Sequence, residues 1–184
     1  MKRMDHADWK WAVALADKAH SPVRNYVVPG VTSSLIERAP DGTLYRLFES
    51  SRSQQDGVTP HSHRFGFTAW VLSGRVTNRL WHLTDRIDGD EFAIRHVHST
   101  GVPGATYTTQ HAGSGFFRYA DDTYGPGDVY SMTAPEIHSI FFSRGAVVLF
   151  AERPAECDWS VALEPIVDNE VIPTLKVEPW MFRK

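Results

Sequence analysis

The sequence predicts an all-β protein, an antiparallel barrel or sandwich, with one short helix near its N-terminus. About nine short segments alternate apolar and polar residues or form brief apolar runs, which is typical of strands. Gly, Pro and Asp turns separate these segments, and only one stretch has apolar residues at helical spacing. Many short strands with turn residues between them are typical of antiparallel barrels and sandwiches.

The helix is expected over residues 5–19, where Asp5 can cap the first turn. We expect it to pack on the outside of the barrel, because its apolar residues fall on one face. That face is formed by Trp9, Ala12, Val13 and Ala16. Residues 21–42 are predicted to form turns and short extended pieces.

The barrel is expected over residues 43–152, within a single domain that spans residues 1–184. Gly113-Ser114-Gly115 is expected to interrupt the chain between two of its strands. The predicted strands are Thr43–Phe48, Phe65–Leu72, Arg75–Leu83, Glu91–His98, Ala105–Gln110, Phe116–Ala120, Val129–Met132, Ile137–Ser143 and Ala146–Glu152.

Composition excludes several classes of protein. Hydrophobic residues make up 42% of the 184 residues, which is typical of a folded chain rather than a disordered one. The net charge of −3 provides no basic stripe for a nucleic-acid backbone, and no apolar run is long enough to span a membrane. Cys157 is the only cysteine, so no internal disulfide can form, and we expect a cytoplasmic protein.

A pair of histidines in an extended stretch, just before the predicted strand Phe65–Leu72, indicates the site. His61 and His63 are two residues apart, and side chains two apart on a strand share one face. About sixty residues later the turn Gly125-Pro126-Gly127-Asp128 precedes a strand, a second turn and His138. If the two segments pair, three imidazoles face one point in the interior and form a metal site.

These segments resemble the two sequence motifs of the cupin superfamily. The first motif is matched by Gly57, His61, His63 and Gly74, and the second by Gly125–Asp128 and His138. The resemblance implies a double-stranded β-helix, an antiparallel jelly roll, with the three histidines as metal ligands. Two positions differ from the family pattern: Phe67 stands where a glutamate ligand is expected, and Phe142 stands where a polar residue is expected.

The ligand set limits the metal and the chemistry. Neutral imidazoles suit divalent Fe, Zn, Ni or Cu, and three of them leave coordination positions open. This set resembles that of the thiol dioxygenases, which implies a non-haem iron dioxygenase acting on a small molecule, with Fe as the expected metal and Zn or Ni as alternatives. Two other interpretations stay open: a non-catalytic module that binds a small ligand, and a barrel that a metal merely stabilises.

The pocket around the metal is expected to be apolar with a few polar groups. Strand alternation places Phe65 and Phe67 inside with the two histidines, and Ile140 and Phe142 inside with His138. Polar candidates near its mouth are Arg64, Gln110 and Tyr130. Glu136 is an alternative fourth ligand or a surface turn residue. His96 and His98 are also two apart, but no third histidine has a matching turn.

The C-terminal segment 165–184 is too apolar for a solvated end. It contains Trp180, Met181 and Phe182 after a proline, three large side chains that would form an exposed patch in water. We expect a homodimer, with this segment either crossing to the partner subunit or packing against the N-terminal helix.

Overall fold

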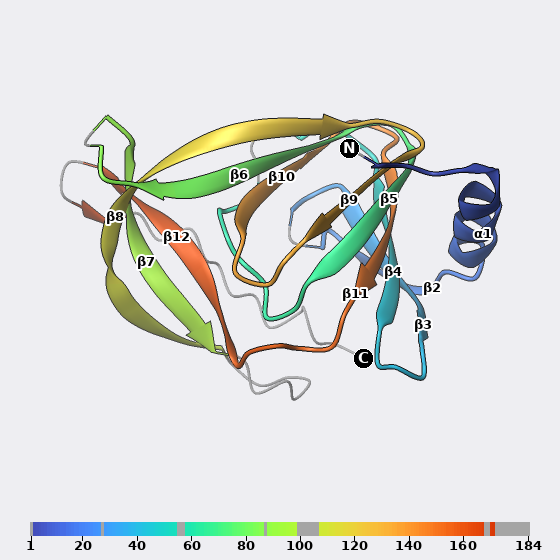
Figure 1. Ribbon diagram of the computed structural model, residues 1–184, viewed down its shortest axis with the longest axis horizontal. Coiled ribbons are helices and arrows are strands. Elements are labelled where there is room, and N and C mark those ends of the chain that lie inside the picture. The colour runs from blue at the N-terminus through green and yellow to red at the C-terminus, as the bar shows by residue number, and fades with distance from the viewer. Residues whose placement is uncertain are drawn as a thin grey trace.

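Two antiparallel β-sheets and one helix, α1 (His6–Ala16), form the part of the chain that the structure describes (Figure 1). This computed structural model describes residues 2–26, 28–54, 58–86, 88–98, 107–167 and 170–171. The first sheet contains, in spatial order, β1 (Lys2–Arg3), β9 (Asp128–Met132), β5 (Phe67–Ser73), β11 (Val147–Glu152), β4 (Leu44–Ser50), β3 (Val31–Arg38) and β2 (His20–Arg24). The second contains β10 (Ile137–Phe142), β6 (Val76–Thr84), β8 (Thr108–Tyr124), β7 (Asp90–His98), β12 (Trp159–Val167) and β13 (Glu170–Val171). The predicted all-β fold of antiparallel strands with one short N-terminal helix is confirmed.

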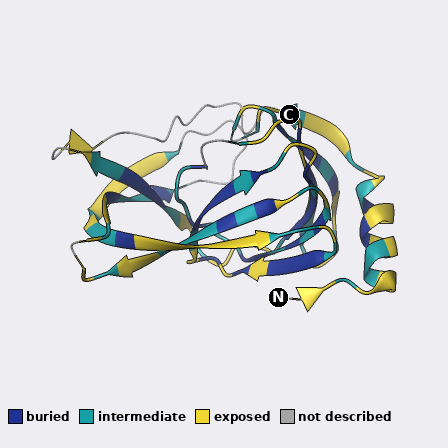
Figure 2. Cartoon of the chain, turned by 90° about the horizontal axis from the view of Figure 1, so that it is seen from above, coloured by how far each residue is buried: buried dark blue, intermediate teal, exposed yellow. Residues whose placement is uncertain are grey.

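The main core lies between the inward face of the first sheet and strands β6 and β10 of the second. Figure 2 shows buried, intermediate and exposed residues along the strands of this sandwich, and on β5 buried and less buried residues alternate. On β5, Phe67, Ala69 and Val71 point inward and are at most 1% exposed. Ile140 and Phe142 of β10 belong to the same apolar cluster, as strand alternation predicted. His138 lies near the start of β10 and shares its inward face with Ile140, so it borders this core.

Helix α1 packs on the outward face of the first sheet. Asp5 is its N-cap, as predicted, and accepts a hydrogen bond from the Asp8 amide. The predicted face is only partly right: Ala12 and Leu15 are the buried helix residues, while Val13 is 37% exposed. They pack with Leu47 and other outward side chains of the sheet, and Trp11 makes edge contacts with Tyr45 and Trp70.

A second apolar cluster lies inside the curl of the second sheet, at the end of the molecule opposite α1 (Figure 1). Phe92, Phe117 and Leu163 are buried there, and Trp81 contacts the Phe92 ring at 5.1 Å. Trp81 neighbours Leu80, which packs on the main core, so the two clusters occupy opposite faces of β6. The jelly roll therefore has a second apolar interior.

A segment between β4 and β5 joins strands β10 and β12 of the second sheet. His61 forms isolated β-bridges with both His138 of β10 and Ala162 of β12. The Leu163 amide donates to the Pro60 carbonyl at 2.9 Å, and the Ser62 amide donates to the Val161 carbonyl at 2.8 Å. Residues 58–63 thus fill the gap between β10 and β12, and we call them the histidine segment.

Several sequence-based expectations about the strands were wrong. Residues 105–110 and 116–120 were expected as two strands, but β8 runs continuously through Thr108–Tyr124. The register with β7 shifts between Ile94 and Arg95, so β8 has one extra residue there, a β-bulge next to Gly113 at φ 129°. Strands β3 and β12 were not predicted as strands. Strand β5 begins at Phe67 rather than at Phe65. The segment that contains Trp180, Met181 and Phe182 lies outside the described residues, as does Gly57.

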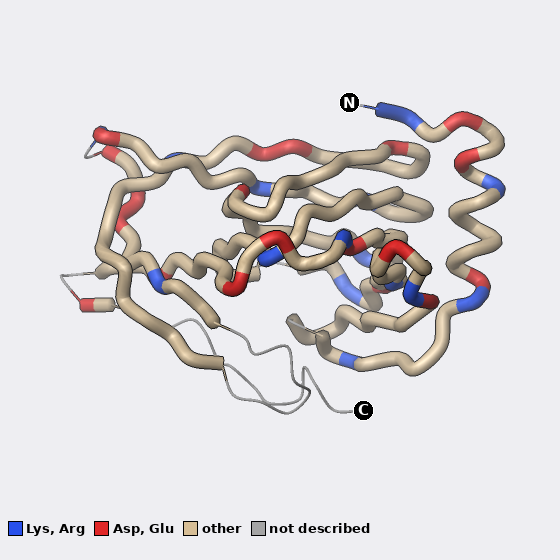
Figure 3. The backbone as a smooth tube through the Cα atoms, turned by 60° about the horizontal axis from the view of Figure 1, so that its bottom comes forward, with Lys and Arg blue, Asp and Glu red and all other residues tan. Residues whose placement is uncertain are grey.

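Charges of both signs are distributed along the described chain (Figure 3). No helix among the described residues is long and apolar enough to cross a membrane.

Candidate metal centre

The backbone places the three histidines by pairing the histidine segment with β10. The His61 amide donates to the His138 carbonyl at 2.9 Å, and the His138 amide donates back to the His61 carbonyl at 2.8 Å. The His63 amide donates to the Ala134 carbonyl at 3.1 Å. His61 and His63 were expected inside a strand, but only His61 makes a bridge, and no strand covers the pair.

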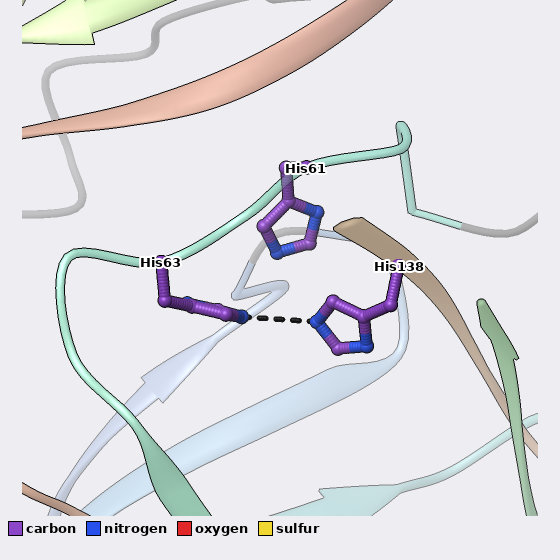
Figure 4. Close-up of side chains that lie close together, drawn as sticks. All are labelled: His61, His63 and His138. Carbon is purple, nitrogen blue, oxygen red and sulfur yellow. Dashed lines mark hydrogen bonds between the residues drawn. The ribbon is translucent and has the colours of Figure 1, made fainter. Parts of the chain in front are cut away.

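The three imidazoles converge on one point. One ring nitrogen from each of His61, His63 and His138 lies within 4.8 Å of the other two. Figure 4 shows the rings pointing toward one another, with His63 Nε2 2.9 Å from His138 Nε2. His138 is 2% exposed, whereas His61 and His63 are half-buried. Two of the three residues therefore keep some exposure to solvent.

Hydrogen bonds fix which nitrogen carries the proton in two of the rings. His138 Nδ1 lies 2.5 Å from Asn78 Oδ1, and the Asn78 amide nitrogen donates to Met132 Sδ at 3.3 Å. His61 Nδ1 lies 2.7 Å from the Thr59 carbonyl oxygen. Both oxygens can only accept, so each Nδ1 is protonated and each Nε2 keeps its lone pair. Nδ1–H hydrogen bonds to oxygen are the arrangement found behind metal-ligating histidines.

Burial keeps the rings uncharged. The pKa values of His63 and His138 are well below the usual range, first because burial disfavours the charged form and then because the neighbouring rings would repel a second charge. Burial also lowers the pKa of His61, although its hydrogen bond to Thr59 opposes this. Neutral imidazole is the form that binds a metal ion.

The donor set fits a divalent transition metal. Two ligands about 2.0–2.2 Å from an ion, at right angles to each other, are separated by about 3 Å, and His63 and His138 are separated by 2.9 Å. Since the three ligand atoms extend over 4.8 Å, a bound ion would draw the rings closer. Among the described residues this is the one group of three or more His, Cys, Asp or Glu close enough to hold a metal.

Aromatic rings flank the histidines. The Phe67 ring lies 5.3 Å from His63 and 5.8 Å from His138, and its side chain is 1% exposed. Phe65 is half-buried and its ring lies 5.3 Å from His63. The position that would carry a glutamate in the cupin motif is therefore apolar and in contact with two of the three rings.

The other predicted pocket residues, Tyr130, Gln110 and Arg64, lie in three different environments. Tyr130 is buried in the main core beside Phe67, where burial raises the pKa of its phenol. Gln110 lies exposed on β8, paired with His96 on the second sheet. Arg64 is half-buried, and its carbonyl accepts from the Glu156 amide at 2.7 Å.

Glu136 belongs to a turn rather than to the cluster. Its carboxylate accepts from the Thr133 amide at 2.6 Å and from the Thr133 hydroxyl at 2.7 Å. The second histidine pair also lies elsewhere: His96 stacks on Trp159 with the ring centres 4.1 Å apart. Neither Glu136 nor His96 joins the three-histidine cluster.

Sequence reasoning missed Asn78, which contacts the site, and an ion pair on the inward face of the first sheet. Asn78 is 1% exposed and holds His138. Arg46 and Glu152 form an ion pair with Nε and Oε1 3.2 Å apart. Strand parity indicated the inward face for both members of the pair, because Arg46 is two residues from buried Phe48 and Glu152 is two residues from buried Phe150.

Comparisons with known proteins give likeness of structure alone. No protein-family model matches the sequence, and no curated protein matches it. Among solved structures, hydroxypropylphosphonic acid epoxidase from S. wedmorenis is 12% identical with a TM-score of 0.45, covering 75% of this chain and 56% of that chain. KdgF from Halomonas sp. is 15% identical with a TM-score of 0.41, covering 74% and 91%. A variant of oxalate decarboxylase from Bacillus subtilis is 12% identical with a TM-score of 0.46, covering 77% and 29%. The chain thus spans little more than half of the epoxidase.

Proposed function

We propose that His61, His63 and His138 hold a divalent transition metal and that the protein is a non-haem iron dioxygenase acting on a small molecule. The observation that carries this proposal is the convergence of three neutral imidazoles. In two of them the hydrogen bond of Nδ1 to an oxygen fixes the proton on Nδ1, so the lone pair of Nε2 is available to a metal. Three neutral ligands would leave positions for a substrate, unlike a closed structural site.

The chain's own residues provide the setting for this chemistry. A ferrous ion would supply reaction with oxygen that no protein side chain can perform. Asn78 and the Thr59 carbonyl orient two of the rings, while Phe67 excludes water on one side. His61 and His63 are half-buried, so a small molecule could approach from the histidine segment. Apolar walls with few polar groups are typical of small-molecule sites.

A metal-stabilised, non-catalytic barrel is the second candidate, and one observation favours it. The histidine segment is bonded to both β10 and β12. An ion bound to His61, His63 and His138 would therefore cross-link the segment to β10 and hold the curl of the second sheet in place. A ligand-binding module without catalysis would use the same geometry.

The test is metal content together with oxygen uptake. The full chain, purified without added metal, should contain one divalent ion per chain, with iron expected for an enzyme and zinc or nickel otherwise. His138→Ala should lose that ion, whereas the matched control His96→Ala, in the second histidine pair, should keep it. Oxygen consumption by the ferrous protein favours the enzyme. A cobalt-substituted protein with the spectrum of a closed tetrahedral site favours the structural role.

The remaining expectations also stay proposals. We propose one domain, a homodimer, a small-molecule partner and a cytoplasmic location. Light scattering of the intact chain at micromolar concentration tests the dimer, and a monomer would contradict it.

A further inference from the structure

A groove runs along an open edge of the second sheet, where β6 extends past the start of β10. Ile137, the first residue of β10, pairs with Trp81. Among the described residues, the last three positions of β6, 82–84, therefore have a strand partner only on the β8 side. The groove beside them has a volume of about 400 Å³ and is lined by Leu80, Trp81, His82, Leu83, Phe117, Pro135, Glu136 and Ile137.

The groove is apolar and open to solvent. Six of its eight lining residues are apolar. Leu83 is 69% exposed, although it pairs with Phe117, which is buried in the second apolar cluster. An exposed apolar surface beside an unpaired strand edge is typical of a place where another chain binds. The edge would add main-chain hydrogen bonds to an extended segment, and the groove would take its side chains.

The charges beside the groove favour a basic partner. Two arginines at this end of the sheet, Arg86 and Arg118, are already paired with Asp88. Glu136 lines the groove, is exposed, and forms no ion pair with any described residue. Asp85, directly after β6, is also exposed and has no described ion-pair partner. A basic residue on the bound chain would balance these two carboxylates.

The chain's own segment 172–184, which lies outside the described residues, has the required chemistry in its sequence. Residues 174–178 alternate polar and apolar side chains, which is the pattern of a strand with one apolar face. Three large apolar residues and then two basic ones follow closely: Trp180, Met181, Phe182, Arg183 and Lys184. An extended strand, large apolar side chains and basic residues are the three properties that the groove selects.

The position where the described chain ends also fits. Val171 belongs to β13, which lies at the end of the second sheet's strand order opposite β10 and β6. Thirteen extended residues span about 43 Å, whereas six strands spaced by about 4.8 Å are roughly 24 Å wide. The segment is therefore long enough to leave its own sheet and lie along a groove of a neighbouring molecule.

We infer that the groove beside β6 binds residues 172–184 of a second copy of this chain, with large apolar side chains in the groove and basic residues beside Glu136. This inference rests on the homodimer proposed above, for which it names the contact. Each subunit would give a segment at one end of its second sheet and receive one at the other. Reciprocal exchange of an identical element is a low-cost route to a symmetric dimer.

Leu83→Asp places a charge in the groove, and analytical ultracentrifugation of the full chain measures the effect. The wild type should be a dimer. Leu83→Asp should raise the dimer dissociation constant at least tenfold, as should Phe182→Asp in the segment. The matched control Val13→Asp changes an apolar residue of α1 that is 37% exposed, and it should leave the constant unchanged. A monomeric wild type, or a Leu83→Asp variant that dissociates no more readily than Val13→Asp, would overturn the inference.

A double-mutant cycle tests the charges. Glu136→Gln removes the carboxylate charge and keeps an oxygen that can accept from Thr133. It should weaken the dimer at least threefold, and so should Arg183→Gln with Lys184→Gln. The combined variant should be about as weak as either parent, because both changes remove one interaction. Additive losses would contradict the contact between the basic residues and Glu136.

Disulfide formation distinguishes a segment of a second copy from one that folds back on its own chain. Leu83→Cys and Phe182→Cys are prepared as separate full-length variants, each with Cys157→Ser, and are mixed and oxidised in air; Trp180→Cys replaces Phe182→Cys in a parallel mixture. A disulfide-linked dimer that forms in a mixture, and in no variant alone, supports the exchange. No linked dimer in either mixture would overturn it.

The same variants separate this inference from the proposed metal centre. A chain that holds a metal but whose dimer is insensitive to Leu83→Asp refutes the contact alone. A chain that holds no metal, and whose dimer dissociates in Leu83→Asp, refutes the proposed function while the contact stands.

Discussion

Replacing Asn78 by leucine tests the metal centre through a residue that would not itself touch the ion. Asn78 is 1% exposed, and its Oδ1 is the acceptor for His138 Nδ1 at 2.5 Å. Leucine has a similar shape but accepts nothing. The His138 N–H is then buried without a partner, at a cost of roughly 1–3 kcal/mol. At about 2–4 °C per kcal/mol for a chain of this size, the melting temperature should fall by about 2–12 °C.

Metal affinity should fall independently of this loss of stability. Without the Asn78 oxygen, His138 can carry its proton on Nε2, the nitrogen that would face the ion. Loss of such an oxygen partner typically lowers metal affinity about 10–100-fold. Nitrogen-15 NMR of the metal-free protein should show the His138 proton on Nδ1 in the wild type and a mixture of tautomers in Asn78→Leu.

A matched control removes a buried hydrogen bond from the other face of β10. Ser139 is 3% exposed and accepts from Trp81 Nε1 at 3.1 Å. Ser139→Ala should lower stability and leave metal affinity and the His138 tautomer unchanged. Wild-type zinc affinity and a wild-type tautomer in Asn78→Leu would refute the role assigned to Asn78.

Three further predictions concern pH, the apolar ligand position and the C-terminal segment. The pKa values of His61, His63 and His138 are lowered in the folded state, so the unfolded chain binds more protons than the folded chain just below pH 6.5. The free energy of unfolding of the metal-free protein, measured by urea denaturation, should therefore fall as the pH drops through this range. The slope of this fall should be smaller in His138→Gln. Phe67→Glu should bind zinc more tightly, because it adds an anionic ligand beside His63 and His138, while the metal-free variant should melt at a lower temperature. Competition with a chelator measures the zinc affinity, and an unchanged affinity in the folded variant would contradict the prediction. Deletion of 172–184, residues outside the described chain, should shift the mass measured by light scattering toward the monomer, and a dimer that persists would refute a tail that crosses over.

Local patterns predicted the elements that depend on neighbouring residues. Asp5 caps α1 as its residue type predicts, and Gly74 makes the turn between β5 and β6. A Cβ at Gly74 would lie 2.6 Å from Ala146 Cα, so a larger residue would clash there as well as being strained at φ 67°. The convergence of His61, His63 and His138 followed from two short motifs, although the strand assumed for the first two is absent.

Contacts between distant strands could not be predicted in the same way. Glu152 meets Arg46 only because β11 pairs with β4 in one register, and a shift of one residue would turn Glu152 to the outward face. Asn78 faces His138 for a similar reason, since β6 and β10 place Leu80 opposite His138 and Ile140 opposite Asn78. The register between two strands depends on the residues of the whole sheet, not on the two residues that the register brings together.

The position of the histidine segment between β10 and β12 has a consequence for kinetics. Its backbone bonds join residues 60–63 to residues 134–138 and 161–163, so the chain must close long loops before the three rings meet. Contacts between such distant residues form slowly, and a metal ion would find its ligands assembled only late in folding. We therefore expect added zinc to slow the unfolding of the protein and to leave its folding rate nearly unchanged.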